Sequence, residues 1–317
     1  MSWKSNAARV LNAALRRYDI RVVRGVDHWH PATQLGRQPD PPTAVADPAG
    51  AGSYFRTYAG TEIGPVQAPF DFAVVMPTVL RPSIVDAIGS VFAQKFEGRV
   101  QLLIGVDAPV GSFDIVERAC RAVPPQHLVQ IFYPGYSTSR RHGGLHYCWC
   151  GGSLRTMLSY LANSRYVAYL DDDNWYAAGH LASMRDAVQG NDWAYSRRWY
   201  VHPVSRRPIC EDEWEAIGPV PGGTEVDEAG WVDPNCLAID KVACEAVLRW
   251  WSIPLRNTST ATDADRNIFR ILRTEFKGRG TGQATVFYML SESDLFRHPF
   301  RLSKIGAERY AAAGALD

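Results

Sequence analysis

The sequence predicts an α/β fold built around a doubly wound, mostly parallel sheet. Between residues 70 and 170, short apolar segments alternate with amphipathic segments, which is the order of strands and helices in βαβ units. The last of these apolar segments, residues 167–170, runs directly into three carboxylates, Asp171, Asp172 and Asp173. No G-x-G-x-x-G sequence follows the first apolar segment, so the usual dinucleotide-binding site is disfavoured.

The elements before the carboxylates follow from the periodicity of apolar residues. The strands show no polar alternation, as in parallel sheets that are covered on both faces. Pro82 and Ser83 open the first helix, because proline is tolerated in a first helical turn. In chain order, we expect strands at residues 72–78, 100–106, 128–133 and 167–170, and helices at residues 82–92, 113–122 and 151–161.

Beyond Asp173 the predicted order is less regular. We expect a helix at residues 180–188, a strand at 194–202, a Pro- and acid-rich loop at 203–228, helices near 241–251 and 263–272, and a strand at 284–290.

The composition excludes several classes of protein. Of the 317 residues, 46% are hydrophobic and 21% are charged, which is ordinary for a globular α/β core. The formal net charge of +1 gives no general attraction to nucleic acid, and we expect no such partner. The six cysteines lack the spacing of a zinc site. No apolar run approaches the roughly 20 residues of a membrane-spanning helix, and no cleavable signal is recognisable, so we expect a cytoplasmic protein.

The N-terminal region differs from the rest of the chain. Residues 3–24 form a basic amphipathic stretch, suited either to the anionic inner face of a membrane or to packing on the main domain; the sequence leaves both open. A segment rich in Pro, Gly and Ala follows and is typical of an extended connector. We therefore expect three regions: residues 1–69 (amphipathic helix and connector), 70–290 (globular domain) and 291–317 (C-terminal tail).

The aspartate triplet predicts a cation site. Crowded carboxylates repel one another, and their charge persists only where a cation compensates it. Asp171 and Asp173, delivered to the carboxyl edge of the sheet, are hard oxygen ligands suited to Mg²⁺ or Mn²⁺, bridging to a diphosphate. The alternative is a solvated turn that caps the next helix.

Five segments in order connect this site to a known family. They are Val74-Val75-Met76-Pro77-Thr78, Ile104-Gly105-Val106-Asp107, Tyr169-Leu170-Asp171-Asp172-Asp173, Trp231-Val232-Asp233-Pro234-Asn235 and Asp263-Ala264-Asp265-Arg266. In these residues the chain resembles the family-2-type glycosyltransferases of the GT-A fold. The resemblance covers about residues 70 to 290.

The resemblance implies a metal-dependent transfer, with inversion, from a nucleotide-diphosphate sugar to a hydroxyl of a glycan or a lipid-linked acceptor, as in polysaccharide biosynthesis. A UDP-sugar is the expected donor. The family's pattern assigns Pro77, Thr78 and Asp107 to the donor nucleotide. Arg81 and Arg155 are candidates for a phosphate contact, although surface salt bridges would equally explain them, and Asp172 is a further candidate for the nucleotide site.

The acceptor hydroxyl requires a carboxylate base, for which Asp265 is the first candidate and Asp263 the second. Both also suit helix capping, and Thr262-Asp263 stands where many family members have Glu-Asp. Trp231, Asp233 and Asn235 are candidates for contacts with the acceptor or the donor sugar.

Three further points remain open in the sequence. His180 and His298 are candidate metal ligands, although a lone histidine is more often structural. A sugar-1-phosphate nucleotidyltransferase is the first alternative function, disfavoured because no Gly-rich, Lys/Arg-bearing loop follows the first strand. A non-catalytic glycan- or nucleotide-binding module on the same scaffold is the second.

Overall fold

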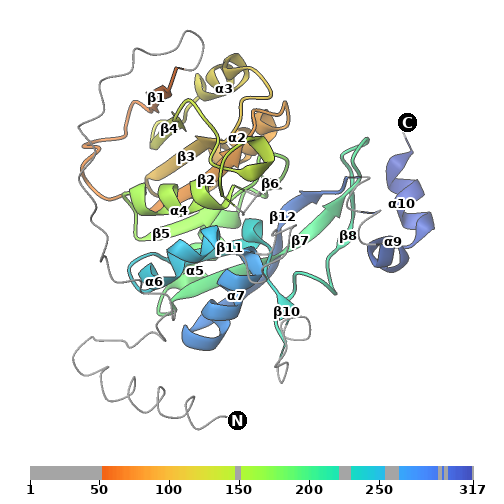
Figure 1. The fold of residues 1–317 in the computed structure, drawn as a ribbon. Coiled ribbons are helices and arrows are strands. Elements are labelled where there is room, and N and C mark those ends of the chain that lie inside the picture. Colours follow the sequence, from red (N-terminus) through yellow and green to blue (C-terminus); the bar gives the residue numbers. More distant parts are fainter. Residues whose placement is uncertain are drawn as a thin grey trace. The chain divides into compact units, whose positions relative to one another are not determined.

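Ten strands form one mixed sheet, which runs through the computed structural model (Figure 1). The structure describes residues 52–146, 151–220, 230–253, 264–291, 295 and 299–315. The strands of the sheet are β1 (Tyr54–Ala59), β2 (Phe72–Thr78), β3 (Val100–Val106), β4 (His127–Tyr133), β5 (Tyr166–Tyr169), β6 (Trp175–Tyr176), β7 (Trp193–Val201), β8 (Pro208–Glu211), β11 (Leu237–Asp240) and β12 (Gly278–Met289). Two short strands, β9 (Gly218–Pro219) and β10 (Gly230–Trp231), pair separately.

The helices are α2 (Ile84–Phe92), α3 (Phe113–Cys120), α4 (Gly152–Leu161), α5 (His180–Val188), α6 (Glu245–Leu248), α7 (Ala264–Glu275), α9 (Pro299–Ile305) and α10 (Ala307–Gly314). Three 3₁₀ turns complete the set: η2 (Arg140–His142), η3 (Pro234–Cys236) and η4 (Arg249–Ser252). Within the described ranges, none of these helices combines the length and the hydropathy that crossing a bilayer requires.

The sheet has the order β1-β4-β3-β2-β5-β11-β7-β12-β6, with β8 paired to β7. Strands β4, β3, β2 and β5 are parallel, and β7 and β12 run in the same direction. Strands β1, β11, β6 and β8 run the opposite way. The structure thus confirms the predicted α/β class with a mostly parallel sheet.

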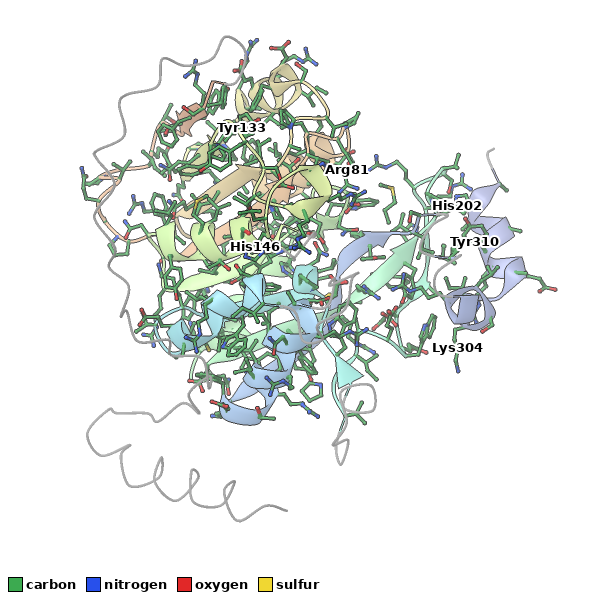
Figure 2. The ribbon with its side chains drawn as sticks, in the orientation of Figure 1. Arg81, Tyr133, His146, His202, Lys304 and Tyr310 are labelled. Atoms are coloured by element: carbon green, nitrogen blue, oxygen red, sulfur yellow. The ribbon has the colours of Figure 1, made fainter. Side chains whose placement is uncertain are left out.

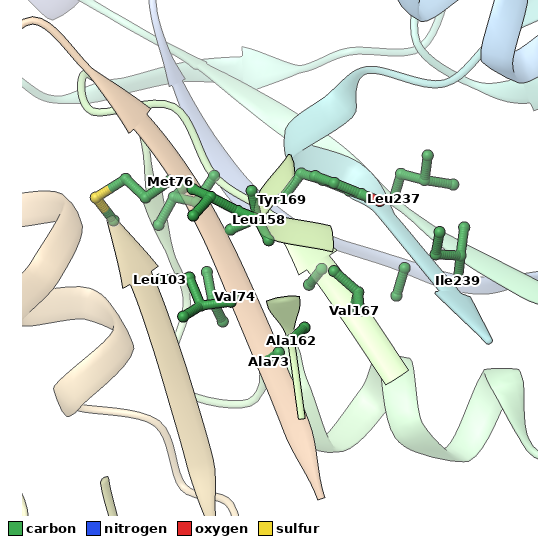
Figure 3. Close-up of a cluster of buried hydrophobic side chains, with 14 of the residues drawn as sticks. Ala73, Val74, Met76, Leu103, Leu158, Ala162, Val167, Tyr169, Leu237 and Ile239 are labelled. Carbon is green, nitrogen blue, oxygen red and sulfur yellow. The ribbon is translucent and has the colours of Figure 1, made fainter. Parts of the chain in front are cut away.

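The core lies where the parallel strands pack against helices. Every residue of β2 and β3 is buried, which explains why these strands lack polar alternation. Figure 3 shows Met76, Leu103, Leu158 and Tyr169 meeting in this core. A Cβ on Gly105 would lie 2.8 Å from a methyl group of Leu158, so the glycine allows α4 to pack directly on β3.

The chain reverses its direction of travel across the sheet between β2 and β5. It moves from β2 to β3 and on to β4, and then returns to place β5 on the other side of β2. Because such crossovers are right-handed, α2 and α3 cover one face and α4 covers the other. The connection after β5 lies beside α2, where the Gln94 side chain donates to the Ala177 carbonyl at 2.8 Å and accepts from the Leu181 amide at 2.9 Å. The carboxyl ends of β2 and β5 lie side by side at one edge of the sheet, the edge at which doubly wound sheets usually bind ligands.

Two predicted boundaries differ from the structure. β1 lies inside the region predicted as a connector, where it pairs with β4 along its whole length. Most of its residues are exposed, so this edge strand has no apolar periodicity to reveal it. In the predicted tail, α10 contacts β8, and the Tyr310 ring lies 4.6 Å from His202 (Figure 2). The amphipathic stretch at 3–24 lies outside the described residues.

Later elements were predicted with smaller errors. The segment predicted as a loop at 203–228 contains β8 and β9, and β12 begins at Gly278 rather than near residue 284. The helix predicted near 241–251 is divided into α6 and η4. The helices α5 and α7 and the strand β7 lie where the sequence predicts them.

Candidate functional site

Asp172 joins the carboxyl ends of β2 and β5. Its side chain is only 1% exposed, and Oδ2 accepts hydrogen bonds from Thr78 Oγ1 at 2.6 Å and from the Val79 amide at 3.3 Å. Thr78 ends β2, and Asp172 follows β5 by three residues. The structure therefore holds the middle aspartate in place as a tie between strands, with little surface left for a ligand.

A strained turn directs Arg81 to the aspartates. Leu80 is fully buried and has a φ of 64°, a conformation that costs energy for any residue with a β-carbon. Its amide donates to Thr78 Oγ1 at 2.7 Å, which fixes the turn. Arg81 then forms ion pairs with both Asp172 and Asp173, the latter at 2.8 Å, while about half of its side chain stays exposed.

Asp171 is held from two sides. The Arg155 guanidinium, buried on α4, forms an ion pair with Oδ1, and Asn235 Nδ2 donates to Oδ2 at 2.9 Å. Asn235 Oδ1 also accepts the Asp171 amide at 2.6 Å, so Asn235 fixes both the backbone and the side chain. Arg155 lies 5.5 Å from the Trp251 ring, a cation–π contact that orients it.

Asp173 is the least constrained member of the triplet. Its side chain is 32% exposed, close to the 30% of Asp171. Burial of the carboxyl raises its pKa to about 7, with the Asp171 and Asp172 charges acting in the same direction and Arg81 opposing them. The site therefore has more negative charge than its two arginines neutralise.

The donor set fits a divalent cation that is shared with a substrate. Among the described residues, no group of three or more His, Cys, Asp or Glu side chains is arranged to hold a metal ion. Mg²⁺, however, is usually bound by one or two carboxylates together with substrate phosphates and water. Asp171 and Asp173 supply two hard, partly exposed carboxylates of this kind.

Asp265 lies in the first turn of α7, and its Oδ1 accepts the Arg266 amide at 2.8 Å. Burial raises the pKa of this carboxyl to about 6; the Arg266 and Arg155 charges lower it and the Asp233 charge raises it. The neighbouring Arg266 guanidinium lies 4.2 Å from the Trp231 ring, so the start of α7 contacts the segment that carries Asp233 and Asn235. The second candidate base, Asp263, lies outside the described residues.

The predicted nucleotide residues gather at the same edge of the sheet. Asp107 follows β3, and its amide donates to the Thr78 carbonyl at 2.9 Å. Its carboxylate accepts from Ser137 Oγ at 2.6 Å and lies 3.8 Å from His142 Nε2. Neither partner was predicted. Pro77 packs against the start of α4, where a Cβ on Gly151 would lie 2.7 Å from it.

The residues predicted to contact the sugar are buried instead. Trp231, Asp233 and Asn235 have almost no exposed surface. Asp233 Oδ1 accepts from both the amide and the Nδ2 of Asn235, and its Oδ2 pairs with Arg198. The polar side-chain atoms of Asp233 and Asn235 are thus bound within the protein, and the structure gives these two residues a role in positioning Asp171 that the sequence analysis did not predict.

Arg198 was also missed, although the sequence carries a signal for it. It occupies a fully buried position in β7, between aromatic residues that predict a strand. A charged residue at such a position requires buried partners of opposite charge. His180 has a structural environment: it stacks on Tyr176, and its Nδ1 lies 2.8 Å from Thr285 Oγ1. His298 lies outside the described residues.

Comparisons with known proteins give only distant likenesses. No family model matches the chain, and no curated protein matches it. Among solved structures, TarS from S. aureus in complex with UDP matches with a TM-score of 0.48 and 10% identity, over 72% of this chain and 62% of that chain. TarS with UDP-GlcNAc gives 0.46 and 12%, over 70% and 59%. The mannosyltransferase PcManGT from Pyrobaculum calidifontis, with GDP-Man and Mn²⁺, gives 0.47 and 10%, over 80% and 66%.

The chain thus spans less than two thirds of the TarS chains in those two complexes. Similarity at this level carries no conclusion about activity.

Proposed function

We propose that the chain is a metal-dependent glycosyltransferase of the GT-A type, which moves a sugar from a nucleotide-diphosphate donor to a hydroxyl acceptor. The main support is the position of Asp171, Asp172 and Asp173 at the carboxyl ends of β2 and β5, beside Arg81 and Arg155. Carboxylates and arginines together suit a diphosphate that arrives with a divalent ion.

In this proposal Asp171 and Asp173 would hold Mg²⁺ or Mn²⁺, which would supply positive charge to neutralise the departing diphosphate. Asp172 keeps the ends of β2 and β5 together through Thr78. Arg81, half exposed and paired with Asp173, is placed to contact a phosphate. Asp107 accepts a hydrogen bond from the nucleotide base, and a UDP-sugar is the proposed donor.

The general base, which removes the proton from the acceptor hydroxyl, is Asp265 in this proposal. An acceptor hydroxyl attacks the anomeric carbon as the bond from that carbon to the diphosphate oxygen breaks, and the hydroxyl proton passes to the Asp265 carboxylate. A direct displacement of this kind inverts the configuration. A pKa of about 6 leaves the group mostly ionised at neutral pH, yet basic enough to accept the proton. The acceptor is a glycan or a lipid-linked sugar, with residues 3–24 as the proposed membrane contact.

A screen of donor hydrolysis tests the proposal. Purified protein is incubated with a panel of UDP-, GDP- and dTDP-sugars and Mn²⁺, and release of the nucleoside diphosphate is measured. We expect release from at least one donor, loss of release in excess chelator, and loss in Asp173→Asn. Release unaffected by chelator would remove the metal from the proposal. No release and no Mn²⁺-dependent binding of any nucleoside diphosphate would overturn it.

A further inference from the structure

Arg198 is the centre of a buried ionic network. Its side chain is 0% exposed, and its guanidinium pairs with three carboxylates: Asp212 at 2.9 Å, Glu215 at 2.9 Å, and Asp233. The Tyr200 hydroxyl accepts a further bond from Nη2 at 3.1 Å. The planar guanidinium provides the fixed fork of donors that this arrangement requires, which a lysine ammonium does not.

One branch of the network leads to the candidate metal ligand. Arg198 Nη1 pairs with Asp233 Oδ2, and Asp233 Oδ1 accepts Asn235 Nδ2 at 2.6 Å and the Asn235 amide at 2.9 Å. Asn235 in turn fixes the amide and the carboxylate of Asp171. Asp233 therefore fixes the orientation of the Asn235 side-chain amide, and that amide in turn fixes the position of Asp171.

The second branch leads to the C-terminal helices. Glu215 accepts two hydrogen bonds from Arg301 of α9, at 2.8 and 2.7 Å. Both arginines also lie near the Tyr288 ring, Arg198 at 4.2 Å and Arg301 at 5.8 Å. The network thus runs from α9 through Arg198 to Asp171.

A network of this kind is costly as a source of stability alone. Removing charges from water costs several kcal/mol per ion, and well-packed apolar residues often replace buried ion pairs without loss of stability. The three carboxylates around Arg198 also converge on one side chain, and among the described residues its hydrogen bonds reach Asp171 through Asp233 and Asn235. This geometry is that of an outer shell around a ligand, where a hydrogen-bonded partner orients the group that binds.

We infer that Arg198 is a positioning residue for Asp171, acting through Asp233 and Asn235. The consequence for metal binding rests on the proposed function, whereas the effect on the geometry of Asp171 does not. Arg301 supports Arg198 by fixing Glu215, which assigns the C-terminal helices to the same unit as the site.

The test uses Arg198→Lys, Asp233→Asn and Asn235→Ala in the full-length protein, and the double variant Arg198→Lys/Asn235→Ala. Asp233→Asn preserves shape if Arg198→Lys does not fold. Val116→Ala, a buried residue of α3, controls for a general loss of stability, and Arg165→Lys controls for an ion pair at the other end of β5. Two quantities are measured: the amide resonance of Asp171 by NMR, and the affinity for Mn²⁺ in the presence of UDP.

We expect the network variants, but neither control, to shift the Asp171 amide resonance and to weaken Mn²⁺ binding by about 10- to 100-fold, as outer-shell changes do at metal sites. The double variant should be no weaker than Asn235→Ala alone, because Arg198 acts through Asn235. An unchanged Asp171 resonance in folded Arg198→Lys and Asp233→Asn, or additive losses in the double variant, would overturn the inference. A wild-type protein without Mn²⁺ binding refutes the proposed function alone, since the resonance still decides the role of Arg198.

Discussion

Thr78 Oγ1 donates a 2.6 Å hydrogen bond to Asp172 Oδ2 between residues 94 positions apart in the chain. The bond joins the end of β2 to the segment that follows its paired strand β5. Thr78→Val keeps the shape but removes the donor from a buried carboxylate. We expect a loss of about 1–3 kcal/mol in the free energy of unfolding, measured by urea denaturation, and weaker binding of the donor nucleotide. Thr78→Ser retains the hydroxyl and should stay close to wild type.

The raised pKa of the Asp173 carboxyl predicts how the stability of the fold depends on pH. Its folded-state pKa is raised from 3.8 to about 7, so the folded protein binds this proton more tightly than the unfolded chain does. The group therefore lowers stability progressively as the pH rises from about 4 to about 7, and fully above that range. In chelator, Asp173→Asn should match the wild-type melting temperature near pH 4 and exceed it at about pH 8. A melting temperature below wild type at both values would contradict the prediction.

Arg81 compensates two aspartates in the described site. Removing its charge in Arg81→Ala increases the repulsion among the three carboxylates, so the affinity for Mn²⁺ alone should rise. Binding of UDP should weaken, because a cation placed for the phosphate is lost. Titration followed by the electron paramagnetic resonance of free Mn²⁺ gives the first quantity, and calorimetry gives the second. Arg165→Ala, remote from the triplet, should change neither.

The protonation of Asp265 should determine how kcat/KM falls at acid pH. With a pKa of about 6, the carboxylate becomes protonated below that pH, and kcat/KM should fall there in proportion to the ionised fraction. Asp265→Asn should lower kcat by roughly a hundredfold or more with little change in donor binding. Asp263→Asn is the neighbouring control. Near wild-type transfer by Asp265→Asn with an inactive Asp263→Asn would move the base by two residues, and full activity of both would exclude the pair.

Two N-terminal truncations distinguish the strand β1 from the region before it. A chain beginning at residue 52 retains β1, whereas one beginning at Pro69 exposes the edge of β4, which is paired with β1 over six residues. An unprotected apolar edge strand promotes association. We expect the first chain to be folded and monodisperse in size-exclusion chromatography, and the second to melt at a lower temperature or aggregate. Equal behaviour of the two would mean that β1 contributes little.

The parallel strands could be predicted from the sequence because they are buried on both faces. Burial of β2 and β3 requires an uninterrupted apolar run, and such runs are visible without a structure. The position of the triplet was predictable for the same reason, since Asp171 follows the apolar strand β5 by two residues. The order of the strands then places it beside Thr78.

The rest of the site depends on contacts distant in sequence. Asn235 and Arg155 meet at Asp171 from segments 64 residues after it and 16 residues before it. The spacing of these residues along the chain does not predict that their side chains are in contact. The sequence analysis assigned Asn235 to sugar binding because a short polar side chain beside an aromatic residue suits a sugar, but the same residue types also suit a buried hydrogen-bond network.

Above the Asp173 pKa of about 7, the two arginines and three aspartates of the described site leave one negative charge uncompensated. A divalent ion alone would reverse that excess, and a nucleoside diphosphate alone would add to it. The divalent ion and the nucleoside diphosphate should therefore each bind more tightly when the other is present. Thermodynamic linkage requires that each raises the affinity for the other by the same factor. A protein with this balance would respond weakly to free metal or to free nucleotide, and strongly to the preformed metal–nucleotide complex. Its donor would then be loaded in a single step.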